Sequence, residues 1–202
     1  MGKPGTYVRA YHLILTAYGF WLPNDPRGSW SDFVRSFELV RFGRATKTAE
    51  RRSLARDPSD HRIRRAAKQA LVRDPAVFDG LQARAVARGL GASVARSGFV
   101  IHACAVMPDH VHLVVARHRY SIERVAMQLK SNASRELVAE GLHPFQHVLY
   151  ADGTRPVPWA RKHWSVFLSD DEGIDRAIRY VNNNPVRDGK KAQAWTFVVP
   201  FV

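Results

Sequence analysis

The stretch Met107-Pro-Asp-His-Val-His-Leu-Val-Val115 says the most about how this chain folds. Its first residues favour a turn, and the apolar residues after them favour a strand. Side chains alternate along a strand, so His110 and His112 share one face while Val111 and Leu113 point to the other. Two neutral imidazoles side by side can hold one divalent metal ion. A plain strand with two partly exposed histidines is the alternative interpretation.

The segments on either side of this stretch predict a hairpin within a larger sheet. Apolar runs flank the Met-Pro-Asp-His turn, Ser121 is typical of a helix N-cap, and Gly89 is typical of a helix end. Acidic residues at 170–172 favour the start of a last helix that runs through Tyr180. We expect strands at 7–17, 99–106, 111–117 and 163–168, and helices at 46–56, 59–73, 76–88, 121–140 and 169–184.

This order of elements predicts an α+β fold of the ferredoxin-like split β-α-β type. A four-stranded antiparallel sheet would carry its main helices on one face. An additional C-terminal helix with the tyrosine would cross the other face, beside the histidines. We expect one domain over residues 1–202, with a basic helical insertion at about 18–97 and an apolar C-terminal tail at about 188–202. The tail is expected either to add a strand or to fold across the groove beside the histidines.

Length and composition exclude several classes of protein. With 202 residues and 46% hydrophobic content, the chain can build the core of a soluble globular domain. It has no run of roughly 20 apolar residues and no secretory signal, so we expect no membrane partner and a cytoplasmic location. The single cysteine, Cys104, lies in an apolar run and is expected to be a buried thiol rather than a nucleophile.

The charge of the chain favours polyanionic partners. It has 31 Lys and Arg against 18 Asp and Glu, a net charge of +13. Residues 44–96 contribute 13 basic and five acidic residues to this balance. Such an excess favours phosphate backbones through release of counterions. A solvated basic helical surface without a specific partner is the alternative.

A second group of polar residues lies on the last predicted helix. Tyr180 and Asn184 are four residues apart, which places a phenol and an amide on the same helix face. Asn184 can offer an oxygen ligand to a hard cation, although more weakly than a carboxylate. The alternative is a helix that Asn184-Pro185 simply ends, with Tyr180 packed on the sheet.

Taken together, these segments resemble the single-tyrosine HUH transposases, and within them the REP-associated tyrosine transposases. The resemblance implies a metal-dependent single-stranded DNA endonuclease and strand transferase that acts at palindromic repeat hairpins in DNA transposition. Single-stranded or hairpin DNA would be the partner. The segments that carry the resemblance are Tyr11-His-Leu13, Trp21-Leu-Pro-Asn-Asp-Pro-Arg-Gly28, Val106-Met-Pro-Asp-His-Val-His-Leu-Val114, Lys130-Ser131, His163-Trp164 and Tyr180-Val-Asn-Asn-Asn-Pro-Val186.

The resemblance also implies roles for individual residues. Tyr180 would be the catalytic nucleophile that forms a 5′-phosphotyrosine. His110, His112 and Asn184 would bind Mg²⁺ or Mn²⁺, with Asn183 as the alternative third ligand and zinc still open from ligand type. Three other imidazoles, His12, His102 and His163, are interpreted as ordinary strand residues outside the metal site.

Contacts to DNA are expected from basic side chains near these motifs, while aromatic rings would stack on unpaired bases. Two other functions remain open: a non-catalytic DNA- or RNA-binding regulator on the same fold, and a metal-dependent RNA nuclease. The residues also leave monomer and homodimer open. The expected DNA-binding residues are Arg27, Arg117, Lys130, Arg135, Arg161, Lys162 and Arg187.

Overall fold

The computed structural model describes residues 7–26, 28–29, 31–48 and 60–202. Most of the helix expected at 46–56 therefore lies outside the described residues. The other expected elements are present, most of them with shorter bounds. In chain order the structure contains β1 (Ala10–Thr16), α1 (Phe37–Val40), α2 (His61–Gln69), α3 (Gly80–Ser97), β2 (Ile101–Val106), β3 (His110–Ala116), α4 (Ile122–Ala139), β4 (Trp164–Leu168) and α5 (Asp171–Arg187).

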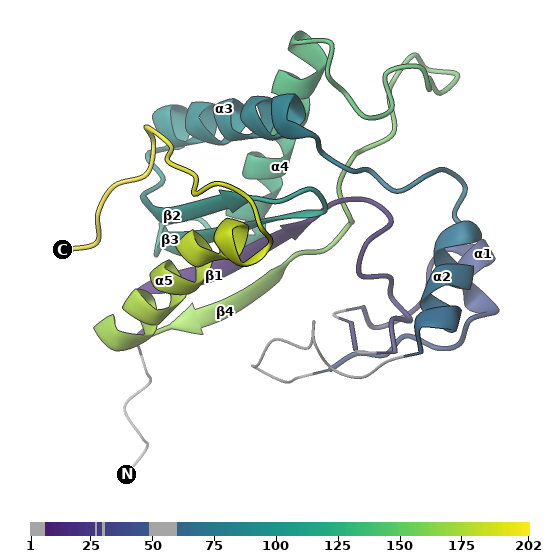
Figure 1. Ribbon diagram of the computed structural model, residues 1–202, viewed down its shortest axis with the longest axis horizontal. Coiled ribbons are helices and arrows are strands. Elements are labelled where there is room, and N and C mark those ends of the chain that lie inside the picture. The colour runs from purple at the N-terminus through teal and green to yellow at the C-terminus, as the bar shows by residue number, and fades with distance from the viewer. Residues whose placement is uncertain (1–6, 27, 30, 49–59) are drawn as a thin grey trace.

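The four strands form one antiparallel sheet in the order β2-β3-β1-β4. The helices α3 and α4 pack together on one side of it, and α5 lies across the other (Figure 1). This is the predicted α+β split β-α-β fold, with the additional C-terminal helix where it was expected. The central strands β1 and β3 are each paired on both sides, which makes them the most firmly held part of the sheet.

Strand alternation divides the core into two layers. Leu13 and Leu113 point toward α3 and α4, where they join a large buried cluster with Leu90 and Leu129. The opposite face is lined by smaller residues, and α5 buries Ile174 and Val181 against Ala103, Ala105 and Val114. Because β2 presents alanines on this side, α5 can lie close to the sheet.

The helix α3 corrects one sequence prediction. We expected a helix over residues 76–88 that ends at Gly89, but α3 begins after the Asp79 N-cap and continues to Ser97. Gly89 lies where α3 crosses α4, and a Cβ atom there would come within 2.5 Å of the Ala133 Cα. The glycine therefore allows close helix packing. The chain leaves the helix at Gly98, which has a positive φ of 68°.

The helix α5 continues past the point where a proline was expected to end it. Asp170 caps its first turn, and Pro185 lies inside its last turn. The Pro185 carbonyl accepts hydrogen bonds from the backbone amides of Asp188 and Lys190, which closes the helix end. Tyr180 and Asn184 are consequently both on regular helix.

The remaining segments lie around the sheet. The short helices α1 and α2 stand to one side of it, around a small cluster of Leu22, Leu39 and Ala67 (Figure 1). At the β2 edge, Gln193 exchanges two hydrogen bonds with the Val106 backbone, and Val198 forms a parallel bridge with Ile101. The insertion expected at 18–97 remains a prediction. Within that range, α3 packs with α4 on the sheet and is part of its main core. None of the described helices combines the length and apolarity needed to cross a bilayer.

Candidate active site

The two histidines of β3 lie on the sheet face that α5 covers. Their ring centroids are 4.5 Å apart and the rings are perpendicular. The next strand, β1, brings a third imidazole to them, because the His12 ring centroid is 5.1 Å from that of His112. The sheet thus gathers three imidazoles from two central strands.

Hydrogen bonds fix the orientation of these rings. The Nδ1 of His110 lies 2.7 Å from the Asp109 carboxylate, and the Nδ1 of His112 lies 3.0 Å from Nε2 of His12. In each β3 histidine the other ring nitrogen, Nε2, therefore stays free of these bonds. A carboxylate that holds the far nitrogen of an imidazole is the usual support of a metal-binding histidine.

Burial keeps two of the rings uncharged. Burial, reinforced by the nearby His110, lowers the pKa of His12 to about 4. Burial, with His110 and His12 close by, also lowers the pKa of His112 well below its ordinary value. Burial acts in the other direction on Asp109, but the hydrogen bond and charge of His110 outweigh it and lower the pKa of that carboxyl. At neutral pH His12 and His112 are therefore uncharged, and the nearby Asp109 carboxyl is a carboxylate.

The helix α5 brings Tyr180 to the same place. The Tyr180 ring centroid is 5.5 Å from that of His112 and 5.6 Å from that of His12. Asn184, one helical turn later, lines the same cleft, whereas Asn183 is exposed and outside its lining. The Arg187 guanidinium lies 5.9 Å from the centre of the tyrosine ring. A phenol, imidazoles, a side-chain amide and a guanidinium therefore meet at one site.

The residues of this site suit a divalent metal only when the amide of Asn184 is included. Within the described part of the chain, no group of three or more His, Cys, Asp or Glu side chains forms a metal-binding cluster. His110 and His112 offer two nitrogen ligands with oriented Nε2 atoms, and Asn184 adds an oxygen. This mixed donor set is compatible with Mn²⁺ and Mg²⁺.

The site opens into a large cleft of about 1220 Å³. One wall, here called the catalytic wall, consists of the sheet face, α5 and the segment 160–164. A second wall, here called the insertion wall, consists of the segments 18–26 and 31–36 and of α2. The catalytic wall contributes His12, His110, His112, Tyr180 and Asn184 to the lining.

Three of the expected DNA-binding residues line this cleft: Arg161, Lys162 and Arg187. Arg27 lies outside the described residues. Arg117 follows β3 at the end far from His110, with its guanidinium 4.5 Å from the centre of the Tyr7 ring. Arg135 is exposed on α4 and donates to Asn132.

Lys130, which is also among the expected DNA-binding residues, binds backbone carbonyls beside the cleft. Its Nζ donates to the backbone carbonyls of Ala160 and Lys162, at 2.8 Å each. Burial lowers the pKa of Lys130 to about 8. Lys130 thus holds the segment that carries Arg161, and it lies outside the lining of the cleft.

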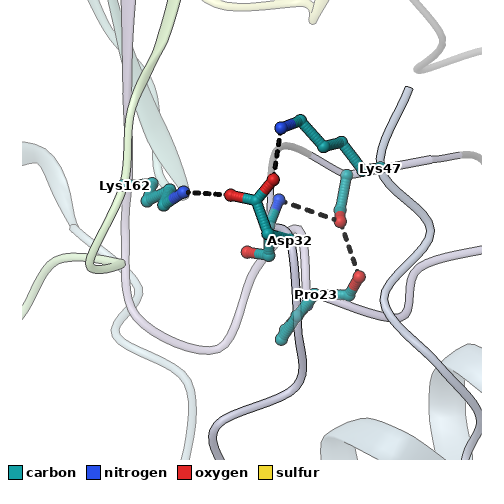
Figure 2. A network of polar contacts seen from close by, with 6 residues as sticks. Pro23, Asp32, Lys47 and Lys162 are labelled. Atoms are coloured by element: carbon teal, nitrogen blue, oxygen red, sulfur yellow. Dashed lines mark hydrogen bonds and ion pairs between the residues drawn. The ribbon is translucent and has the colours of Figure 1, made fainter. Parts of the chain in front are cut away.

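An ion-pair network joins the two walls (Figure 2). The Asp32 carboxylate of the insertion wall contacts Lys47 on one side and accepts a hydrogen bond from Lys162 on the other, at 3.0 Å. The hydrogen bond from Lys47, followed by that from Lys162, lowers the pKa of Asp32 to about 2. At neutral pH the Asp32 carboxylate is charged and forms an ion pair with Lys162 of the catalytic wall.

Sequence reasoning left out His12 and did not single out Asp109. His12 was visible as a polar residue within an apolar strand, but its role depends on the pairing of β1 with β3, which one sequence does not reveal. Of the other two imidazoles, His102 bonds the tail through the Val199 carbonyl, whereas His163 lines the cleft.

Comparison with known proteins identifies the family to which this fold and site belong. The family model of IS200-like transposases matches residues 76–184, more than half of the chain. The chain therefore belongs to the IS200-like transposase family. This confirms the resemblance at the level of the family and gives the protein a function related to DNA transposition.

Two solved structures are similar to this chain. One is a REP-associated tyrosine transposase bound to a REP hairpin, with 12% identity, a TM-score of 0.46, and coverage of 94% of this chain and 75% of the other. The second is a candidate transposase from Deinococcus radiodurans R1, with 15% identity, a TM-score of 0.41, and coverage of 95% and 98%. No curated protein sequence matches the chain.

Proposed function

We propose that this protein is a metal-dependent single-stranded DNA endonuclease and strand transferase. The observation that carries the proposal is the position of Tyr180, whose ring centroid lies 5.5 Å from that of His112 in a cleft lined by basic residues. The motifs shared with REP-associated tyrosine transposases extend the proposal to hairpins at palindromic repeats as the substrate.

In this proposal, His110 and His112 bind the metal through Nε2, and the Asn184 side-chain oxygen is the third protein ligand. A bound Mg²⁺ or Mn²⁺ ion would neutralise charge that develops on the scissile phosphate. Asp109 and His12 act on the ligands rather than on the DNA. They hold the Nδ1 atoms of the two histidines by hydrogen bonds, which leaves each Nε2 available to a metal.

Tyr180 acts as the nucleophile. Its phenolic oxygen forms a bond to the phosphorus, and the bond between the phosphorus and the 3′ oxygen breaks. The phenol loses its proton to solvent in the cleft, and the departing oxygen takes up a proton to become a 3′-hydroxyl. The product is a 5′-phosphotyrosine. Because one phosphate ester replaces another, a second 3′-hydroxyl can later attack the phosphotyrosine and rejoin DNA without ATP.

Arg187, Arg161 and Lys162 hold the DNA in this mechanism. Arg187 follows Tyr180 by two helical turns and lies over its ring, so it can bind a phosphate next to the scissile one. Arg161 and Lys162 precede β4 and line the same cleft. Cations at these positions bring the phosphate backbone to the tyrosine. Because they contact phosphates and not bases, they do not recognise the DNA sequence.

The test uses an end-labelled DNA hairpin with a single-stranded flank, incubated with Mg²⁺ or Mn²⁺. We expect a protein–DNA adduct that survives SDS, and its loss in Tyr180→Phe. Tyr7→Phe is the matched control, because Tyr7 is 68% exposed and lies away from the cleft. An adduct that persists in Tyr180→Phe would exclude this nucleophile. The absence of any adduct with the unmodified protein would favour the non-catalytic regulator.

A further inference from the structure

The helix α2 presents a basic face that belongs to no element of the catalytic wall. His61, Arg64, Arg65 and Lys68 are spaced at i, i+3, i+4 and i+7, the spacing that places side chains on one side of a helix. All four line the cleft that Tyr180 also lines, together with Ile63 and Ala67 of the same helix. Arg62, on the same helix, is exposed outside the lining.

Packing within the insertion wall fixes the position of α2 at the cleft, because Leu22, Leu39 and Ala67 line the cleft as well. Ala67 is buried against Leu22 and Leu39, and the Asp60 side chain caps the first turn of the helix. The Lys68 ammonium lies 4.1 Å from the centre of the Phe20 ring, which also lines the cleft. The helix that carries the basic face is therefore held at the cleft.

The two walls together present cations to whatever enters the cleft. The catalytic wall contributes Arg161, Lys162 and Arg187. Acidic groups in the lining are fewer: Asp25, Asp32, Asp109 and Asp188. Asp32 contacts Lys162, Asp109 contacts His110, and Asp188 contacts Lys190. Cations on both sides of one channel suit a chain of phosphates better than a single anion.

The lining also contains aromatic rings, and the cleft is larger than a small molecule needs. Phe20, Trp21 and Phe33 lie among the basic residues of the insertion wall. Basic grooves with interleaved aromatic side chains are the usual site for unpaired nucleic acid, because every base has a face on which to stack. A volume of about 1220 Å³ exceeds the roughly 300–1,000 Å³ of small-molecule pockets.

We propose that the basic face of α2 binds the backbone phosphates of an unpaired DNA strand that continues to Tyr180. The insertion wall is then the second half of the DNA-binding site, and Arg64 and Arg65 are its main phosphate contacts. The inference rests on the proposed function for the identity of the strand. It extends that function by assigning a binding role to residues outside the shared motifs.

The experiment measures binding of a fluorescent DNA hairpin with a single-stranded flank, in a Tyr180→Phe background without added metal. We expect Arg64→Gln/Arg65→Gln to weaken binding by about tenfold or more and to reduce the slope of log K against log salt by about 1.4, since each lost phosphate contact removes about 0.7. The control Arg62→Gln/Arg84→Gln removes the same charge from exposed sites outside the cleft. It should change affinity less than twofold.

Several results would overturn the inference. The first is a loss of affinity in the control variant as large as that in Arg64→Gln/Arg65→Gln. The second is an equal loss of affinity of the glutamine variant for blunt duplex DNA. The third is an RNA strand of the same sequence that binds as tightly as the DNA and depends on the same arginines. Should the double glutamine variant melt earlier, Arg64→Lys/Arg65→Lys must restore binding, and its failure to do so counts against the inference. The adduct assay separates the two proposals. If the unmodified protein forms the adduct but the glutamine variant binds DNA with unchanged affinity, only the role of α2 is contradicted. If the unmodified protein forms no adduct, only the proposed chemistry is contradicted.

Discussion

The two walls of the cleft are built in different ways. The catalytic wall takes His12 and His112 from β1 and β3, strands that are paired on both sides and packed against a large core. The insertion wall is formed by the loop segments 18–26 and 31–36 and the nine-residue α2, around a cluster of three buried residues. Rigid elements hold reacting groups within the narrow geometry that chemistry demands. A small module with few buried contacts can shift its position, which suffices for the proposed contacts to the phosphates of a DNA strand.

The largest expected effect concerns the chemistry of the catalytic wall. His112→Ala should reduce cleavage of the hairpin by about 10³-fold or more, because loss of a metal ligand removes several kcal/mol of charge stabilisation. Binding of the same DNA without metal should change less than about twofold. The measurements are single-turnover cleavage and fluorescence anisotropy.

His102→Ala is the control for this substitution, since His102 contacts the tail at the β2 edge and not the cleft. If His112→Ala instead weakened binding as much as cleavage, the two walls would not divide chemistry from binding, and the imidazoles would be part of the DNA contact.

The second prediction concerns the layer behind the catalytic wall. Gly89→Ala places a Cβ atom 2.5 Å from the Ala133 Cα, so α3 and α4 must move apart. We expect the free energy of unfolding to fall by about 2–4 kcal/mol, measured by urea denaturation. Gly80→Ala, which meets no atom within 4 Å, should leave stability unchanged or raise it by up to about 1 kcal/mol. Equal stability of the two variants would contradict the close helix packing.

The sequence predicted the sheet, and the placement of Tyr180 and Asn184 on one face of α5, because both depend on local periodicity. Alternation placed His110 and His112 on one face, and helical spacing placed Asn184 with Tyr180. The sequence could not show that β1 lies beside β3, so His12 was left out. It also misassigned Gly89, because a glycine that ends a helix and one that allows helix crossing look alike. Lys130 was grouped with DNA contacts because position in a motif does not reveal burial.

The third prediction concerns Lys130, which fixes the edge of the catalytic wall. Its pKa in the folded protein is about 8, below the ~10.4 of an unfolded chain, so the unfolded state binds more protons between these values. Stability from this group therefore rises as the pH increases. From pH 7 to 9.5 the protein should gain about 1–2 kcal/mol relative to Lys130→Met, measured by urea denaturation.

The same substitution at the exposed Lys191 controls for the loss of one charge. A loss of stability of the protein relative to Lys130→Met as the pH rises would contradict the buried ammonium.

The smallest expected effect concerns the ion pairs that join the walls. Asp32→Asn removes the carboxylate that occupies Lys162 and Lys47, so both cations become available to phosphates. We expect DNA affinity to rise about two- to threefold at low salt and the gain to disappear at high salt. Asp175→Asn, an exposed change of the same charge on α5 outside the cleft, is the control. Weaker binding in Asp32→Asn would show that the carboxylate positions the insertion wall instead of competing with DNA.

The central position of β1 has a consequence for biosynthesis. Its first partner, β3, begins 94 residues after β1 ends, and its second, β4, comes later still. At about 5–20 residues per second, the ribosome needs about 5–20 s to deliver β3. During that time Leu13 and Leu15 have no sheet to join, and the nascent chain depends on chaperones or on the polar alternation of His12 and Thr16 to avoid aggregation.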